Sequence, residues 1–219
     1  TLIDDLLDLA AVKTGLRVTG ETEPVDLQVV LTRIVERHRV PAAEKGIDLQ
    51  VQISDSHPIC VAATTEELDR AFTNLVSNAV KYTPEGGLVE ITLGAQAGKA
   101  QLVVRDSGIG VPAEALPHLF EEFYRAPNAK AQVKQGTGLG LVITKDIVTR
   151  YGGTIRVSST EGEGTTVTVI LPTIAASADE ATSDVTTDTP QNTRVMDSGI
   201  TPRNSRMEES CGDKEDSDC

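Results

Sequence analysis

The order in which helix-like and strand-like periods alternate along the 219 residues constrains the fold more than any other feature. Apolar residues recur with a helical period around residues 27–35, 68–82 and 139–151, and a short helix is expected at 113–123. Runs typical of strands fall at 48–53, 89–93, 101–104, 154–157 and 165–171. Strands that follow one another as pairs, mixed with helices, indicate an α+β fold. We expect a two-layer α/β sandwich in which helices cover one face of a mixed sheet.

The two ends of the chain differ from its middle. Residues 1–18 carry apolar positions at helical spacing with aspartates between them, which fits either a surface helix of the domain or the end of a longer helical bundle. From Thr173 onward Ser, Thr, Asp, Glu and Pro dominate, so this segment is expected to be disordered, because it cannot bury enough apolar area to offset its ordering entropy. We therefore divide the chain into 1–18, a folded domain at 24–172 and an acidic tail at 173–219.

Charge and cysteine content exclude several classes of protein. The formal net charge is −13, and the tail contributes −7 of it, with eleven acidic and four basic residues. Such an acidic chain is not expected to bind nucleic acid or an anionic membrane. Cys60, Cys211 and Cys219 show neither a disulfide framework nor zinc spacing, which favours a reducing compartment. No segment approaches the ~20 apolar residues that span a bilayer, and no signal peptide is visible.

The first candidate segment carries two asparagines and a lysine on one helix face. Asn74 and Asn78 are four residues apart, and Lys81 follows on the same face. A neutral amide oxygen can hold Mg²⁺ on a triphosphate without repelling the phosphates, and the lysine supplies countercharge. The alternative is that both asparagines only cap the helix or face solvent. Two poor helix formers within one helix favour the functional interpretation.

The second candidate segment is an acidic turn at the end of an expected strand. Asp106 is followed by Ser107, Gly108, Ile109 and Gly110. A carboxylate there can accept a hydrogen bond from an exocyclic amine such as that of adenine, and the glycines let backbone approach a flat base. By itself, the segment is also compatible with an ordinary Asp-Ser-Gly turn.

The third candidate segment is a glycine-rich loop that opens an expected helix. Bare amides at a helix N-terminus can bind anionic oxygens. The loop is neither a P-loop, since no Gly-Lys-Ser/Thr follows, nor a dinucleotide fingerprint, since no strand precedes it. The polar stretch 126–135 before it lacks apolar periodicity and is expected to be mobile. A flexible hinge remains the alternative. The glycine-rich loop consists of Gly136, Thr137, Gly138, Leu139, Gly140 and Leu141.

In this order, the three segments resemble the nucleotide-binding boxes of the sensor histidine kinases of two-component systems, which share the Bergerat (GHKL) ATP-binding fold. Further similarity lies in three other segments, Leu2–Leu9, Leu119–Arg125 and Gly162–Thr166. The resemblance covers residues 1–172. It implies that residues 1–18 end a dimerisation helical hairpin and that 24–172 form the catalytic domain.

The resemblance also implies a role for each candidate residue. Asn78 would bind Mg²⁺, and Asn78, Lys81 and Arg125 would be the catalytic residues. Asp106 would accept the adenine amino group. The remaining expected contacts to ATP are Asn74 near the phosphates, Tyr82 and Thr165 near the base, Gly108 and Gly110 in the wall beside it, Arg125 with the lid 126–135, and the loop from Gly136 to Leu141.

These kinases phosphorylate a histidine in a His-Glu motif, and the chain has none. His38, His57 and His118 lie elsewhere and are expected to be structural or surface residues. The implied function is therefore to donate the ATP γ-phosphate to a histidine on a dimerisation domain outside this chain, for relay to a response regulator receiver domain. The resemblance further implies a homodimeric parent anchored in the plasma (inner) membrane, with this domain in the cytoplasm.

Three other functions remain open from the sequence. An ATPase of the same fold would need a glutamate as general base where Asn74 stands, so slow hydrolysis is expected. A serine kinase of the anti-sigma type shares the nucleotide pocket but does not account for residues 1–9. A degenerate ATP-binding scaffold would not need the intact Asn78, Asp106 and glycine-rich loop.

Overall fold

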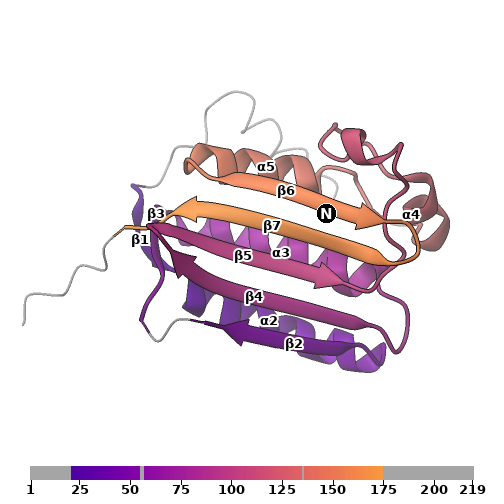
Figure 1. Ribbon diagram of the computed structural model, residues 1–219, viewed down its shortest axis with the longest axis horizontal. Helices are drawn as coiled ribbons and strands as arrows, with labels where there is room; N and C mark the ends of the chain where they lie inside the picture. Colours follow the sequence, from indigo (N-terminus) through magenta and orange to yellow (C-terminus); the bar gives the residue numbers. More distant parts are fainter. Residues whose placement is uncertain (1–20, 55–56, 135, 175–219) are drawn as a thin grey trace, which may run out of the picture. The chain divides into compact units, whose positions relative to one another are not determined.

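The computed structural model describes residues 21–54, 57–134 and 136–174. Its main sheet has five strands in the order β2-β4-β5-β7-β6, with β2 parallel to β4 and all other neighbours antiparallel. The strands are β2 (Asp48–Ile53), β4 (Leu88–Gln96), β5 (Lys99–Asp106), β6 (Thr154–Thr160) and β7 (Gly164–Pro172). Helices α2 (Leu27–Glu44), α3 (Thr65–Tyr82) and α5 (Gly140–Arg150) lie together on one face of this sheet (Figure 1). The expected α+β sandwich with a mixed sheet is confirmed.

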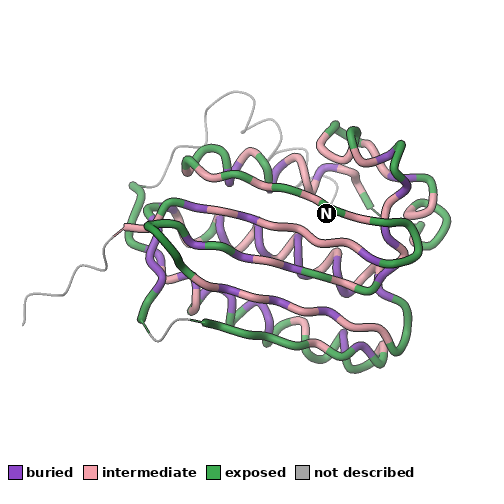
Figure 2. Tube along the Cα trace, in the orientation of Figure 1, coloured by how far each residue is buried: buried purple, intermediate pink, exposed green. Residues whose placement is uncertain are grey.

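The core lies between the sheet and the three helices. Buried and half-buried residues alternate along most of β4 (Figure 2). The buried ones are Val89, Ile91 and Leu93, which belong to the core between sheet and helices. Phe72 and Leu75 of α3 are buried on the facing side. Because side chains on a strand alternate between its faces, Val104 and Asp106 on β5 share the helical side. The strand period therefore sends the Asp106 carboxylate toward the helical layer.

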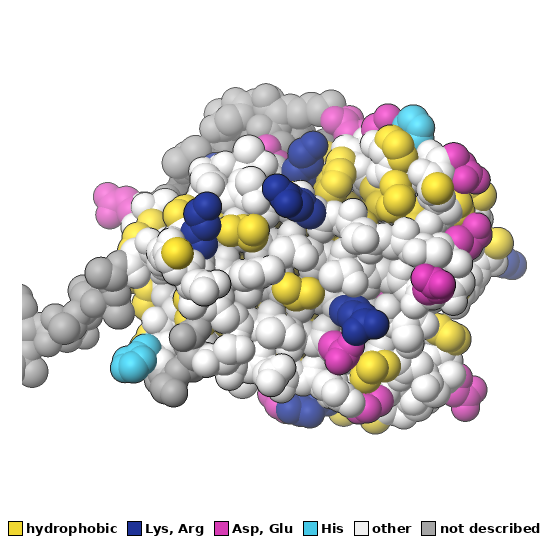
Figure 3. Space-filling model, in the orientation of Figure 1, with side chains coloured by type: hydrophobic (Ala, Val, Ile, Leu, Met, Phe, Trp, Pro, Cys, Tyr) yellow, Lys and Arg dark blue, Asp and Glu magenta, His cyan; other side chains and the backbone are white. Residues whose placement is uncertain are grey.

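The opposite face of the sheet carries no helix among the described residues, and Figure 3 looks onto it. Its strands present mainly polar side chains, such as Thr166 and Thr168 of β7. Arg105 and Glu90 form a cross-strand ion pair with a 3.2 Å separation, and both side chains are exposed. An exposed pair of this kind contributes at most about 1 kcal/mol to stability. This pattern is typical of an antiparallel sheet with one solvated face.

Helix α3 is defined at both ends by specific contacts. Thr64 is its N-cap, and its hydroxyl accepts a hydrogen bond from the Glu67 amide at 3.4 Å. At the other end, the Lys45 ammonium donates to the carbonyl oxygens of Val80 and Lys81 at 2.9 and 2.8 Å. A cation that binds the last carbonyls stabilises a helix end. The helix that carries Asn74, Asn78 and Lys81 is thus held at both ends.

Two short elements were not predicted from the sequence. Strands β1 (Glu23–Asp26) and β3 (Cys60–Ala63) pair antiparallel as a separate two-stranded sheet. Neither Glu-Pro-Val-Asp nor Cys-Val-Ala-Ala alternates apolar with polar residues, so neither strand could be recognised by itself.

The prediction of a short helix at 113–123 is wrong. Only a 3₁₀ turn, η1 (Leu116–His118), forms there. Pro117 lacks an amide hydrogen, and a proline inside a helix breaks its hydrogen bonds. Phe123 adopts a left-handed φ of 63°, which also ends any helix at that point.

The polar stretch 126–135 contains an unexpected helix, α4 (Pro127–Gln132). Pro127 stands in its first turn, where a missing amide costs nothing. The mobility of this stretch remains a prediction. The boundaries proposed at 1–18, 24–172 and 173–219 also remain predictions, because residues 1–20 and 175–219 lie outside the described residues. Within the described ranges, none of the helices combines the length and the apolar character needed to cross a membrane.

Candidate functional site

A cavity of about 740 Å³ lies where α3, the ends of β5–β7, α4 and the start of α5 come together. That size is in the range of small-molecule and cofactor sites. Most of the residues predicted from the sequence line it: Asn74, Asn78, Lys81, Tyr82, Asp106, Gly110, Arg125, Gly136, Thr137, Gly138, Gly140, Leu141 and Thr165. Gly108 and Leu139 do not line it. Leu139 is fully buried and anchors the glycine-rich loop in the core.

One end of the cavity is apolar. Val104, Val167 and Val157 are aligned across the neighbouring strands β5, β7 and β6. All three line the cavity, together with Ile109 and Leu119. Sequence reasoning missed these residues, although the strand pattern could have identified the valines once the strand order was known. An apolar wall of this kind suits the face of an aromatic base.

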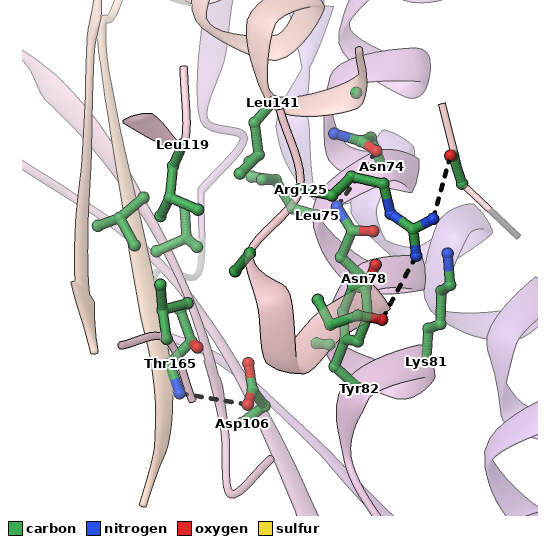
Figure 4. Close-up of a pocket in the computed structure, with 18 of the residues that line it drawn as sticks. Asn74, Leu75, Asn78, Lys81, Tyr82, Asp106, Leu119, Arg125, Leu141 and Thr165 are labelled. Atoms are coloured by element: carbon green, nitrogen blue, oxygen red, sulfur yellow. Dashed lines mark hydrogen bonds between the residues drawn. The ribbon is translucent and has the colours of Figure 1, made fainter. Parts of the chain in front are cut away.

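Asp106 follows Val104 on the same face of β5 and is the last residue of that strand. Its Oδ1 accepts a hydrogen bond from the amide of Gly108 at 2.9 Å. It also accepts one from the amide of Thr165 at 3.2 Å (Figure 4). No hydrogen bond from a described residue reaches Oδ2. Burial raises the pKa of the Asp106 carboxyl, and the bonds from the Gly108 and Thr165 amides lower it less. The carboxylate is therefore fixed through one oxygen and offers the other as an acceptor.

The glycines after Asp106 serve the protein itself. A Cβ on Gly110 would lie 1.9 Å from the Thr160 carbonyl oxygen, and the φ of Gly110 is 61°. A Cβ on Gly108 would lie 2.6 Å from Oδ1 of Asp106 and 2.7 Å from the Tyr82 carbonyl oxygen. Both glycines thus allow close packing of backbone around Asp106. The predicted reason, approach to a base, is not needed to explain them.

Two cations flank the start of the glycine-rich loop. A Cβ on Gly136 would lie 3.2 Å from both the Lys81 Nζ and the Arg125 Cζ. Figure 4 shows both side chains directed to the same side of the cavity. The Lys81 ammonium also lies 5.1 Å from the centroid of the Tyr82 ring. Two cations at one end of a cavity provide the countercharge that a polyphosphate needs.

Arg125 is held by backbone carbonyls of the polar stretch. Its guanidinium donates to Val133 at 2.5 Å, Lys134 at 3.3 Å, and Ala129 and Gly136 at 3.4 Å. Its Nε is buried and has no hydrogen-bond partner among the described residues. A buried donor without a partner is energetically costly.

Asn128 falls within the predicted lid 126–135 but was not singled out from the sequence, and it connects α4 to the acidic turn. Its Nδ2 donates to the Gly110 carbonyl oxygen at 2.9 Å, and its side chain lines the cavity. Sequence spacing gave no signal for this contact, because it joins α4 to a turn 18 residues earlier and only the folded chain brings the two together. Asn128 thereby holds the lid helix beside the pocket.

The glycine-rich loop leads into α5 without a side-chain cap. The first amides of an uncapped helix have no partner within the helix and can bind an anion. Gly138 has a φ of 73°, and a Cβ there would lie 2.6 Å from the carbonyl carbon of Phe123. A Cβ on Gly140 would lie 2.2 Å from Oδ1 of Asn74. Close packing at these two positions therefore requires glycine.

Asn74 and Asn78 lie one turn apart on α3, and their amides are hydrogen-bonded to each other at 3.3 Å. Asn74 also donates to the Thr144 hydroxyl at 2.9 Å. The described residues contain no group of three or more His, Cys, Asp or Glu side chains able to hold a metal. A Mg²⁺ ion at this site would therefore depend on neutral amide oxygen, water and the phosphates of a ligand, which is a usual coordination for Mg²⁺.

Comparison with known proteins agrees with this geometry. Residues 63–175 match the family model described as histidine kinase-, DNA gyrase B-, and HSP90-like ATPase. The chain is 33% identical over 173 residues to the sensor-like histidine kinase SenX3 of Mycobacterium bovis, covering 79% of this chain and 42% of SenX3. It therefore spans less than half of this curated relative.

Solved structures support the same assignment. A mycobacterial sensor histidine kinase, MprB, matches with a TM-score of 0.60 and 34% identity over 69% of this chain and 97% of that one. ShkA, solved at full length in complex with AMPPNP, matches with a TM-score of 0.67 and 29% identity over 80% of this chain and 36% of that one. The chain therefore belongs to the family of histidine kinase-, DNA gyrase B- and HSP90-like ATPases and carries the ATP-binding catalytic domain of the sensor histidine kinases.

Proposed function

We propose that the chain is the phosphoryl-donating domain of a two-component sensor histidine kinase. It binds Mg-ATP and presents the γ-phosphate to a histidine on a dimerisation domain outside these residues, and the phosphoryl group then passes to a response regulator receiver domain. One observation carries the proposal: a single cavity joins a fixed carboxylate acceptor at its apolar end to two cations and an uncapped helix N-terminus at its other end.

Each residue has a defined task in this proposal. Asp106 accepts the adenine amino group and orients the base between the valine row and the lid. Lys81 and Arg125 neutralise the phosphates, and the first amides of α5 donate to phosphate oxygens. Asn78 would hold Mg²⁺, which supplies further charge compensation when it is bound with the nucleotide. Phosphoryl transfer demands chiefly alignment and charge neutralisation, and these side chains supply both.

Asn74 favours phosphoryl transfer to a protein over hydrolysis of ATP. An amide cannot take a proton from water, and here it is already hydrogen-bonded to Thr144 and Asn78. Hydrolysis by the isolated chain is therefore expected to be slow. The matched region covers 42% of SenX3, which is consistent with a longer parent. By analogy with the sensor histidine kinases, we propose that this parent is homodimeric and membrane-anchored, with this domain on its cytoplasmic side.

The first prediction concerns Asn78. The unmodified chain should bind a non-hydrolysable ATP analogue with an affinity that rises with Mg²⁺, measured by isothermal titration calorimetry. Asn78→Ala should lower the affinity about tenfold with Mg²⁺, because the amide oxygen ligand is lost. The same variant measured without Mg²⁺ is the control and should match the unmodified chain. A well-folded unmodified chain that binds no analogue would refute the proposed function and revive the scaffold alternative.

The second prediction concerns the phosphoacceptor. The purified chain incubated with radiolabelled Mg-ATP should acquire no acid-labile phosphate, since none of its three histidines lines the cavity. His38 is hydrogen-bonded to the Ile34 carbonyl oxygen at 2.8 Å, and His118 is paired with Glu121 at 2.7 Å. Acid-labile label should appear on the dimerisation domain of the parent once that domain is added. Acid-labile phosphate on the chain alone would contradict an external acceptor.

A further inference from the structure

Three hydrogen bonds link the metal-binding candidate Asn78 to helix α5. Asn78 Nδ2 donates to Asn74 Oδ1 at 3.3 Å, and Asn74 Nδ2 donates to Thr144 Oγ1 at 2.9 Å. The Thr144 hydroxyl donates in turn to the Gly140 carbonyl oxygen at 2.9 Å. Thr144 is fully buried and does not line the cavity. A buried hydroxyl is costly unless it is hydrogen-bonded, and these bonds satisfy the hydroxyl of Thr144.

The chemistry of the groups fixes the direction of these bonds. The Gly140 carbonyl can only accept, so it takes the single hydrogen of the Thr144 hydroxyl. The hydroxyl must then accept from Asn74, which turns the Asn74 amide nitrogen toward α5 and its oxygen toward Asn78. Asn78 must therefore donate with its own nitrogen. The two ends of an amide look alike by shape, so only such a network decides which end points where.

The orientation of Asn78 matters because its two amide atoms have opposite effects on a cation. With its nitrogen committed to Asn74, Asn78 keeps its oxygen for the cavity that it lines. A flipped amide would present N–H groups to Mg²⁺, and these repel it. Groups behind a metal ligand commonly set its orientation in this way.

We propose that Thr144 is a positioning residue for the metal site, acting through Asn74 to keep the Asn78 oxygen turned toward the nucleotide. This inference rests on the proposed function, in which Asn78 holds Mg²⁺. It assigns Asn74 a role in orienting the ligand, where the sequence had placed it against the phosphates. It also gives Thr144 a role that no motif in the sequence indicated.

The same bonds connect the metal ligand to the phosphate-binding end of α5. Gly140 is the first residue of that helix, and its carbonyl ends the chain of bonds. A Cβ on Gly140 would collide with Asn74 Oδ1 at 2.2 Å, so the contact exists only because the residue is glycine. The amide ligand on α3 and the amides of α5 are thereby held in one geometry before any nucleotide binds.

The test uses an isosteric change with a matched control. Thr144→Val keeps the branched shape and removes the hydroxyl, whereas Thr144→Ser keeps the hydroxyl. Thr83→Val is the control, because Thr83 is also fully buried and its hydroxyl donates to the carbonyl four residues earlier, that of Ala79, at 2.7 Å. Among the described residues the Thr83 hydroxyl is not hydrogen-bonded to Asn74, so its replacement reports the cost of losing a buried hydroxyl alone.

Calorimetric titration of the ATP analogue with and without Mg²⁺ gives the enhancement of affinity by the metal for each variant. We expect Thr144→Val to lower this enhancement about tenfold, as is typical when a group behind a metal ligand is removed. Affinity without metal should change less than about twofold, and Thr144→Ser should restore the enhancement. Thr83→Val should keep it, with a loss of melting temperature similar to that of Thr144→Val.

An unchanged Mg²⁺ enhancement in folded Thr144→Val, or no rescue by Thr144→Ser, would overturn the inference. An unmodified chain whose affinity does not respond to Mg²⁺ would instead refute the proposed function. If Thr144→Val fails to fold, NMR of the side-chain amides in the unmodified chain tests the inference instead. The Asn78 NH₂ signal, assigned by its loss in Asn78→Ala, should exchange slowly with solvent before nucleotide is added. Rapid exchange would overturn the inference.

Discussion

Replacing Asp106 by asparagine should lower the affinity for the ATP analogue about 100-fold. This is the largest loss of affinity that we expect from an isosteric substitution. Asparagine preserves the Oδ1 acceptor for the Gly108 and Thr165 amides, so the local fold is kept. Its NH₂ group then stands where the second carboxylate oxygen accepted the adenine amine, and two donors face each other. Calorimetric titration of both proteins with the same analogue measures the effect.

Base preference provides the control for Asp106→Asn. Guanine carries an acceptor where adenine carries the amine, so the variant should lose its preference for the ATP analogue over the GTP analogue. At neutral pH the variant should be at least as stable as the unmodified chain. Burial raises the pKa of Asp106 in the folded state, so its charge costs stability above that pKa, and this cost is absent below the ordinary value. A stable variant that still prefers the ATP analogue would contradict the role of Asp106.

The same carboxyl predicts a pH dependence of binding. As the pH falls through the raised pKa of Asp106, the carboxylate becomes protonated and loses its ability to accept the amine freely. Affinity for the analogue should therefore begin to fall at a pH above the ordinary range of an aspartate. Asp106→Asn should show no such step in that range, which separates the titration of this group from that of the ligand.

Replacing Gly110 by alanine should destabilise the domain by more than about 3 kcal/mol and abolish detectable binding of the analogue, because strain and a steric clash act together. A Cβ there would lie 1.9 Å from the Thr160 carbonyl oxygen, on a residue with a φ of 61°. The acidic turn would have to move away from the β6–β7 turn, and the lid would lose the Asn128 contact to the Gly110 carbonyl. Chemical denaturation and calorimetry measure the two effects.

The control variant Gly98→Ala separates the effect of backbone strain from that of the steric clash in Gly110→Ala. Gly98 also has a positive φ, 74°, but a Cβ there would meet nothing within 4 Å. We expect this change to cost only about 1 kcal/mol and to leave nucleotide affinity unchanged. Equal losses of stability in the two variants would show that the contact between Gly110 and Thr160 does not matter.

Local chemistry was sufficient to predict the helix that carries the phosphate-side residues. Helix α3 has an apolar stripe, a threonine cap with acidic residues in its first turn, and a lysine in its last turn. Such signals act within a few residues of one another, so they can be recognised without the fold. The placement of Asn74, Asn78 and Lys81 on one face follows from the helical period alone.

Short elements and loops could not be predicted in the same way. Strand β1 is formed by pairing with β3, some 35 residues later, and neither has a pattern of its own. Helix α4 has no large apolar residue, and Asn128 within it donates to the carbonyl oxygen of Gly110, 18 residues earlier. Elements stabilised by contacts distant in sequence leave little local signal.

The sequence by itself determined the alternation of strands and helices, the order of the nucleotide-binding segments and the chemical type of each candidate residue, because these depend on side-chain period and turn chemistry. Only the tertiary structure decided how those residues act. It aligned Val104, Val167 and Val157 across three strands, gave Gly110 a contact with Thr160, and linked Asn78 to Thr144 through Asn74. The direction of a hydrogen bond and the room for a Cβ depend on partners far apart in the chain, so they are fixed only when the chain folds.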